Sequence, residues 1–243
     1  MNQIHIHIER KVYPDRGNNP PHTAIENLSL SLNEHEFVCL VGPSGCGKTT
    51  LLNIIAGLDP EFAGSIEFPL QRTPHLGYVF QEPRLLPWRT VRENLTLALP
   101  KKQDPAIIDE LLAITGLSKF QHVYPQRLSL GMSRRVALAR AFTVAPDLLL
   151  MDEPFVSLDA PTAQSMRELL IRLWSERPHT VLFVTHDLRE AIAFADRLVF
   201  LTPPPATIQS ELEIPLPRIQ RTETVIEDLR RKLLPRHCPA GTK

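Results

Sequence analysis

Two segments near the start of the chain alternate apolar and polar residues. Residues 4–8 and 28–32 carry isoleucine or leucine at every second position, which is the pattern of a strand with one buried face. Half-buried strands of this kind are typical of antiparallel sheets. The pattern therefore predicts a small antiparallel sheet at the beginning of the fold.

Further along the chain, apolar residues form continuous runs that are separated by helical sequence. Such a run indicates a strand buried on both faces, as in a parallel sheet covered by helices. The alternation of these strands with helices predicts an α/β fold with right-handed crossovers. The runs are residues 37–41, 148–151, 181–184 and 198–201, and a helical pattern follows the first of them at 50–56.

The middle of the chain changes to helical sequence without obvious strands. Thr90 and Glu93 have the spacing of a capping box at the start of a helix. Asp104 is expected to cap a second helix that has Pro105 at its first position and ends at Gly116. These signals predict a helical insertion within the α/β core.

The chain from about residue 202 onward is expected to form a C-terminal extension. Thr224 and Glu227 have the spacing of another capping box, for a helix over 224–234. We interpret the extension as an appended lid or contact element. The predicted organisation is thus one domain over residues 1–235, with the helical insertion at about 90–145 and the extension at about 202–243.

Composition and charge argue against two classes of partner. The 243 residues include 27 lysines and arginines and 27 aspartates and glutamates, which gives a formal net charge of +0. A chain without net charge exerts no overall attraction on nucleic acid or anionic lipid. No apolar run approaches the roughly 20 residues of a membrane span, and the start lacks the layout of a secretion signal. We expect a cytosolic protein in which Cys39, Cys46 and Cys238 are reduced thiols.

The most specific chemical motif lies between the strand at 37–41 and the helical pattern at 50–56. It matches G-x-x-x-x-G-K-[ST], a loop whose backbone N–H groups converge on phosphate oxygens at a helix N-terminus. Lys48 is expected to reach the β and γ phosphates of ATP, and the Thr49 hydroxyl to bind Mg²⁺. The predicted ATP-binding residues of this segment are Gly42, Pro43, Ser44, Gly45, Cys46, Gly47, Lys48, Thr49 and Thr50.

An acidic pair follows the apolar run at 148–151. Asp152 stands at a strand end, where a carboxylate can hold Mg²⁺ through water. Glu153 is the candidate general base that polarises the attacking water. Nucleotide kinases and GTPases also carry both elements, so the pair and the phosphate loop leave the reaction open.

Further motifs narrow this choice. In their order over about residues 4–200 they resemble those of the ATP-binding cassette (ABC) ATPases. The resemblance implies a P-loop NTPase of the ABC type, with a parallel core sheet, an antiparallel β subdomain and an inserted helical subdomain. The motifs are Leu128-Ser-Leu-Gly-Met132 for the L-S-G-G-Q signature, Gln81 for the Q-loop, Ser157-Leu-Asp159 for the D-loop and His186 for the switch histidine.

The resemblance also implies a role for each motif in a head-to-tail dimer. Ser129 and Gly131 would contact the γ-phosphate of the ATP that the other subunit holds. Gln81 would bind Mg²⁺, sense the γ-phosphate and link to a membrane partner. His186 would hold the γ-phosphate and order the water, as a catalytic residue beside Gln81 and Glu153. Asp159 would communicate between the subunits.

Three positions fit the resemblance less closely. Tyr13 aligns with the aromatic residue that stacks on adenine in this family, although packing explains it equally well. Leu130 replaces the first signature glycine, and Met132 replaces the glutamine. If the glycine is needed for a backbone angle or a close approach across the dimer, Leu130 weakens closure on ATP and lowers the rate of hydrolysis.

The segment at 81–88 resembles that of the importer ATPases for nitrate, aliphatic sulfonates and taurine. In that group it borders the groove that receives a coupling helix of the permease. Leu85, Leu86 and Trp88 are expected to be exposed for such a contact. A satellite hydrophobic cluster under the loop is an equally good interpretation of the composition.

The resulting hypothesis is an ATPase subunit on the cytoplasmic face of the inner membrane. It would act as a homodimer and power uptake of a small anion through a separate permease and an external solute-binding protein, without binding nucleic acid. Thiamine-precursor pyrimidines are an alternative cargo, because the solute itself does not touch this chain. The alternatives from other classes are a soluble ABC protein acting on nucleic acid or ribosomes, and a low-activity nucleotide-binding regulator suggested by Leu130.

Overall fold

The structure is a computed structural model that describes residues 3–14, 20–69 and 74–237, so Cys238 lies outside the described residues. The chain divides into two compact units. The first combines Met1–Gln71 with Thr180–Lys243, and the second is Arg72–His179. In the described part of the chain, no helix is both long and apolar enough to cross a membrane.

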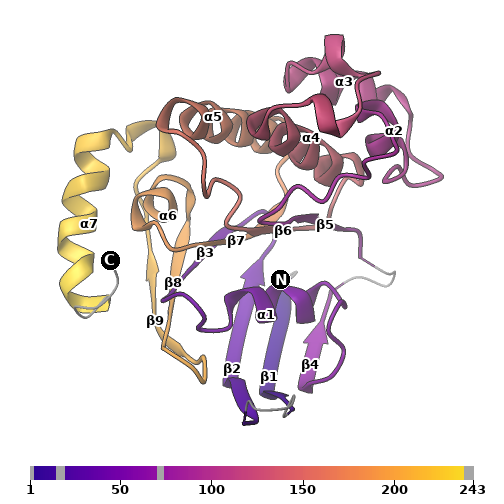
Figure 1. The fold of residues 1–243 in the computed structure, drawn as a ribbon. Helices are drawn as coiled ribbons and strands as arrows, with labels where there is room; N and C mark the ends of the chain where they lie inside the picture. Colours follow the sequence, from indigo (N-terminus) through magenta and orange to yellow (C-terminus); the bar gives the residue numbers. More distant parts are fainter. Residues whose placement is uncertain (1–2, 15–19, 70–73, 238–243) are drawn as a thin grey trace. The chain divides into compact units, whose positions relative to one another are not determined.

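The first unit contains the predicted antiparallel sheet. Its strands β1 (Gln3–Tyr13), β2 (His22–Asn33) and β4 (Ala63–Glu67) lie in the order β2-β1-β4 (Figure 1). Ile4 pairs with Leu32 in this sheet, so the two alternating segments are confirmed as partners. Strand β4 was not predicted, because its residues are largely exposed and show no apolar alternation.

A second set of strands in this unit is parallel, as the continuous apolar runs predicted. Strand β3 (Phe37–Val41) lies between β7 (Thr180–Thr185) and β8 (Arg197–Leu201) and is parallel to both. Every residue of β3 and β7 is buried. Strand β9 (Ile208–Glu213) pairs antiparallel with β8. It therefore extends this sheet with residues that the sequence placed in a C-terminal extension.

The helices of the first unit are α1 (Lys48–Ile55), α6 (Leu188–Phe194) and α7 (Glu223–His237). The capping box predicted at Thr224 for the last helix is wrong, because Thr224 already lies inside α7. The Thr222 hydroxyl instead accepts a hydrogen bond from the Val225 N–H. Glu227 binds Arg189 and Arg230 rather than the start of the helix.

The second unit combines a parallel pair of strands with four helices. Strands β5 (Leu76–Val79) and β6 (Leu148–Asp152) pair in parallel. Between them the chain forms only helices and short 3-10 turns in its regular structure, in agreement with the predicted helical texture. The helices of the unit are α2 (Val91–Thr96), α3 (Ala106–Ile114), α4 (Leu130–Thr143) and α5 (Ala160–Glu176).

The predicted cap of α2 is confirmed, and that of α3 is displaced by one residue. Thr90 forms the complete capping box of α2 with the glutamate three residues later. Pro105 occupies the cap position of α3 instead of its first helical position. Asp104 still accepts a hydrogen bond from the Ala106 N–H at 2.9 Å, so the carboxylate caps the helix from one residue further away. Gly116 follows the helix with a left-handed φ of 71°, as expected of a C-terminal glycine.

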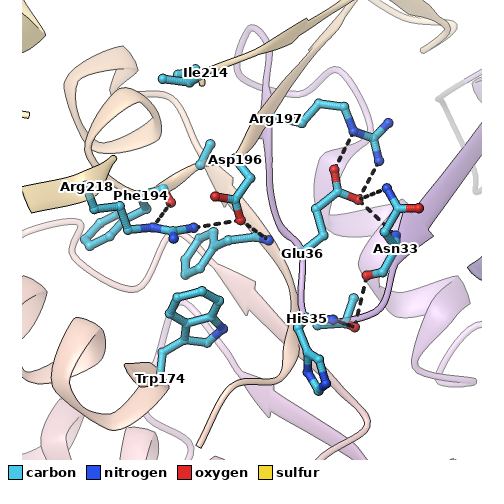
Figure 2. A network of polar contacts seen from close by, with 12 residues as sticks. Asn33, His35, Glu36, Trp174, Phe194, Asp196, Arg197, Ile214 and Arg218 are labelled. Carbon is cyan, nitrogen blue, oxygen red and sulfur yellow. Dashed lines mark hydrogen bonds and ion pairs between the residues drawn. The ribbon is translucent and has the colours of Figure 1, made fainter. Parts of the chain in front are cut away.

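A polar network joins the amino ends of β3 and β8 within the first unit (Figure 2). Arg197 forms a fork with the Glu36 carboxylate, with bonds of 2.8 and 3.0 Å, and also binds Glu211. Glu36 accepts further hydrogen bonds from the backbone and side chain of Asn33. Burial by itself raises the pKa of Glu36, but the bonds from Arg197 and Asn33 outweigh burial and lower that pKa. The network thus stabilises the ionised carboxylate.

Replacing Glu36 by Gln is expected to lower the free energy of unfolding by about 1–2 kcal/mol at pH 7. Because the pKa of Glu36 is lowered in the folded state, its charge adds stability above the unfolded glutamate pKa of about 4.3. That contribution is lost as the pH falls through the folded pKa. Urea unfolding of both proteins at pH 7 and at successively lower pH, through the unfolded glutamate pKa of about 4.3, measures how the difference in the free energy of unfolding changes. Replacement of the exposed Glu9 by Gln is the control. If the loss of unfolding free energy in Glu36→Gln is the same at every pH, the pKa of Glu36 is not lowered by folding.

Candidate nucleotide-binding and signature sites

The phosphate loop connects β3 to α1 in the first unit, and two of its glycines have backbones that other residues rarely adopt. Gly45 has a φ of 77° and Gly47 a φ of 106°. A Cβ at Gly47 would lie 3.0 Å from the carbonyl oxygen of Ala24, so both space and backbone angle require glycine there. The loop is therefore held in a turn that brings its backbone N–H groups together.

The start of α1 is chemically ready for an anion. Its cap residue, Gly47, has no side chain, so no side-chain oxygen accepts from the first turn of the helix. Lys48 is buried, and its ammonium donates to the carbonyl oxygens of Gly42 and Pro43 at 2.8 and 2.9 Å. A phosphate placed here would meet free backbone donors, the positive end of the helix dipole and a lysine.

Cys46 lies inside the loop and is fully buried. Burial raises the pKa of its thiol, although the neighbouring Lys48 acts in the opposite direction. A neutral thiol leaves the positive charge of Lys48 available to another partner.

Tyr13 lies beside the start of α1. Its hydroxyl is 3.1 Å from Thr50 Oγ1 and donates to Asp59 at 3.2 Å. The buried Lys11 lies over the ring, with its ammonium 4.7 Å from the centroid, and forms an ion pair of 2.6 Å with Asp59. Sequence reasoning missed Lys11 and Asp59, because a lysine in a strand gives no sign that its ammonium will be buried. The ring is thus held at the edge of the phosphate loop with one face covered by a cation.

His186 lies at the strand end next to the phosphate loop. Strands β3 and β7 are parallel, with Val41 opposite Thr185, so Gly42 and His186 each leave the sheet at neighbouring carboxyl ends. His186 is exposed. Thr185 directly before it donates to the buried Glu190 at 2.8 Å and accepts from the Asp187 N–H. The first unit therefore brings the loop, Tyr13 and His186 together around one end of the sheet, where ligands bind in open α/β sheets.

The second unit places Gln81 and the acidic pair at the ends of another parallel pair of strands. Val79 in β5 lies opposite Met151 in β6, so Gln81 leaves β5 two residues later and the acidic pair leaves β6 at the same end of the two strands. Asp152 is buried. The pKa of Tyr78 is raised first by burial of the tyrosine and second by the negative charge of Asp152. Glu153 has a left-handed φ of 43°, a strained backbone for a residue with a side chain. Strain of this kind is found where the surroundings hold a functional side chain in one direction.

The signature segment forms the first turn of α4. Ser129 is its N-cap and accepts from the Met132 N–H at 3.2 Å. Gly131 has a role within the unit, because a Cβ there would come within 2.8 Å of the Thr162 methyl group on α5. Asp159 caps α5 by accepting from the Thr162 N–H. Ser129 and Asp159 therefore begin two helices that approach each other closely.

Leu130 is the first residue of α4 and is 46% exposed. It is not among the described residues with a positive φ, so leucine is compatible with the backbone at this position. The backbone angle at this position therefore does not require glycine, whereas a close approach across the dimer stays a prediction. What remains is an apolar side chain at the exposed start of the signature helix.

Arg134 is a functional candidate that sequence reasoning did not single out. Its side chain is buried, and its guanidinium donates to the carbonyl oxygens of Pro154 and Val156. Burial lowers the pKa of Arg134. It lies on the signature helix and holds the backbone that follows Glu153. No local pattern could have identified it, because α4 is buried on most of its faces and has no single apolar stripe.

The loop after Gln81 has two possible interpretations, an exposed contact and a packed cluster, and each fits some of its apolar residues. Leu85 and Leu86 are half-buried, and only Trp88 of the three apolar residues is exposed, at 68%. The Leu86 N–H donates to the side chain of Asn94 at 2.8 Å. The leucines thus pack partly into their own unit, while the tryptophan remains available to a partner.

The oxygen donors present suit Mg²⁺. This ion prefers carboxylate, hydroxyl and phosphate oxygens and usually binds through one or two protein groups together with the phosphates of a nucleotide. Asp152 supplies a buried carboxylate in the second unit, and Thr49 an exposed hydroxyl in the first. No group of three or more His, Cys, Asp or Glu side chains arranged as a metal site occurs in the residues that the structure describes.

Known proteins resemble this chain over most of its length. The ABC transporter family model matches residues 25–156. The nitrate import ATP-binding protein NrtD of Synechococcus elongatus is 41% identical over 240 residues, which are 93% of this chain and 86% of that protein. The aliphatic sulfonates import ATP-binding protein SsuB of Bacillus subtilis is 40% identical, and the match covers 95% of this chain and 92% of that protein. Among solved structures, the chain is similar to the ATP-binding cassette MJ0796 in a dimeric, post-hydrolysis state bound to ADP and Pi. The TM-score is 0.72 and the sequence identity 29%, and the match covers 86% of this chain and 98% of that chain.

Replacing Lys48 by Met is expected to weaken ATP binding by about 30- to 150-fold, or about 2–3 kcal/mol, because a charge-assisted contact to phosphate is lost. Calorimetric titration with ATP measures the change. The exposed Lys101→Met is the matched control for removal of a positive charge. Equal affinities for the two variants would place the nucleotide phosphates elsewhere.

Proposed function

Because the chain belongs to the ABC transporter family and is one of its ATPases, we propose that it is the ATP-hydrolysing subunit of an importer for a small anion. The proposal rests on its similarity to nitrate and aliphatic sulfonates import ATP-binding proteins over 93% and 95% of the chain. Its partners are a second copy of itself, a separate integral membrane permease and, indirectly, an external solute-binding protein. It acts at the cytoplasmic face of the inner membrane. A nitrate-, sulfonate- or taurine-like solute is the proposed cargo.

The phosphate loop is the proposed holder of the nucleotide. Its backbone N–H groups and Lys48 surround the phosphates, while Tyr13 lies on the side where the loop meets α1. Thr49, Gln81 and Asp152 are the proposed protein ligands of Mg²⁺. When bound, Mg²⁺ neutralises phosphate charge and orients the terminal phosphate group. ATP and Mg²⁺ are thus the cofactors we assign.

Glu153 is the proposed general base. Its carboxylate would accept the proton of the attacking water, while His186 and Gln81 hold the water and the terminal phosphate in line. The strained backbone at Glu153 and the grip of Arg134 on the carbonyl oxygen of the next residue support a fixed direction for this side chain. A fixed direction matters because positioning and electrostatics supply most of the catalysis in phosphoryl transfer.

A homodimer would complete each ATP site. Ser129 and Gly131 lie in the first turn of α4, where the helix dipole and backbone N–H groups favour a phosphate of the other subunit. Asp159, at the adjacent start of α5, is the proposed contact between subunits. The dimeric state of the similar cassette bound to ADP and Pi supports this assembly.

Ser129→Asp separates capping from the proposed contact with ATP. Aspartate caps a helix as well as serine does, so thermal stability should be unchanged. The new carboxylate would repel the γ-phosphate of the other subunit, and ATP-dependent dimerisation should weaken by at least about tenfold. Light scattering in a Glu153→Gln background, which retains ATP, measures this. The exposed Ser175→Asp on α5 is the control, and full dimerisation of Ser129→Asp would remove Ser129 from the interface.

The importer assignment is tested by purification of the tagged chain from native membranes in mild detergent. We expect a multi-span membrane protein to accompany it. Trp88→Glu should reduce the recovery of that protein by about tenfold or more, because the variant places a charge in an apolar contact. Repeated recovery of ribosomes or DNA, without a membrane protein, would contradict the proposal. If a membrane protein is recovered, the ligand of the external binding protein that works with it would identify the solute.

A further inference from the structure

The backbone of the loop after Gln81 is held by a side chain of the signature helix. Arg140, on α4, donates from Nη1 to the carbonyl oxygen of Arg84 at 2.9 Å and from Nη2 to that of Pro83 at 3.0 Å. Both acceptors belong to the segment between Gln81 and Trp88. The planar guanidinium presents its donors in a fixed fork, so the two carbonyl groups cannot turn independently while both bonds are present.

The same turn is held from a second side by ring contacts. Arg84 has a left-handed φ of 44°, which is strained for a residue with a side chain. Its guanidinium lies 4.2 Å from the ring centroid of Phe80, and that ring stacks on Tyr78 with a centroid distance of 3.9 Å. These contacts and the Arg140 fork together hold one conformation of the turn.

The far end of the loop is held by Asn94 of α2, which is 1% exposed. Its side chain accepts from the Leu86 N–H at 2.8 Å. Its amide nitrogen donates to the carbonyl oxygens of Leu86, Arg89 and Thr90 at 3.2, 3.1 and 2.9 Å. Gln126 also donates to the carbonyl oxygen of Pro87 at 2.8 Å, so the exposed Trp88 lies in a loop that the second unit holds on both sides.

We propose that Arg140 is a positioning residue that joins the loop at 81–88 to α4, so that Ser129 and Trp88 move as parts of one rigid element. Ser129 caps one end of α4, and Arg140 lies eleven residues along the helix, about 16 Å at 1.5 Å per residue. A displacement of the first turn of α4 by ATP closure would then be passed to the surface that meets the permease. This inference rests on the proposed function and adds the residue that carries the coupling.

Burial is consistent with this role. The pKa of Arg140 is lowered by burial, and its guanidinium is satisfied by backbone carbonyl groups of the loop. A half-buried guanidinium is stabilised while these hydrogen bonds are made, so release of the loop is unfavourable. Lysine would keep the charge but lose the fork.

The first test measures the order of the loop in the isolated chain. The sequence has 2 tryptophans, Trp88 and Trp174, so Trp88 is the only one left in a Trp174→Phe background. In that background, Arg140→Met should lower the residual fluorescence anisotropy of Trp88 by about twofold, as the ring gains nanosecond motion. Arg140→Lys should restore it in part. Arg172→Met, an exposed arginine on α5, should leave it unchanged.

Unchanged Trp88 anisotropy in a folded Arg140→Met or Arg140→Lys protein would overturn the proposal. Thermal unfolding of each variant establishes that it is folded, and Arg140→Lys decides the matter if Arg140→Met does not fold. This measurement needs no permease, so it stands even if the importer assignment fails.

The second test measures coupling in the complex with the permease. The ratio of permease-stimulated to basal hydrolysis removes any loss that both rates share. We expect Arg140→Met to lower this ratio by about three- to tenfold, as loss of one coupling contact between sites allows, with partial recovery in Arg140→Lys. A ratio equal to that of Arg172→Met would show that Arg140 does not carry the coupling.

Discussion

The backbone at Gly47 is the constraint on which the nucleotide end of the first unit depends. Its left-handed φ and the nearby carbonyl oxygen of Ala24 exclude any side chain. The absence of a side chain also leaves the first turn of α1 without a side-chain cap. One steric requirement thereby produces a tight turn, free N–H donors and a buried lysine at a single helix end, which together make an anion site.

The second unit is organised by arginines on one helix. Arg134 and Arg140 both lie on α4, and both donate to carbonyl oxygens of loops rather than to carboxylates. Backbone carbonyl groups outside regular structure need a donor when they are buried. By supplying these donors, α4 determines the course of the chain after Glu153 and after Gln81. The helix that begins after Ser129 is therefore attached both to the loop after Glu153 and to the loop after Gln81.

Three of the six described non-glycine residues with left-handed backbones lie in these loops. Arg84, Glu153 and Ser157 are residues with side chains and left-handed backbones. Such conformations cost of order 1–3 kcal/mol each and persist only where neighbouring contacts outweigh them. At Arg84 and directly after Glu153, such contacts come from Arg140 and Arg134 of α4. Apolar side chains could fill the same space but could not satisfy the carbonyl groups.

The sequence by itself determined the buried strands, the phosphate loop and the order of the motifs, because each depends on local pattern and spacing. Strand β4 has no such pattern and β9 alternates only weakly, around a serine at its centre, so pairing with β1 and β8 decided that they are strands. Tertiary structure alone also decided that Lys11 and Arg134 are buried, and that Arg140, Leu85 and Leu86 are half-buried. The physical reason is that a polar group can be buried only where distant segments supply its hydrogen-bond partners.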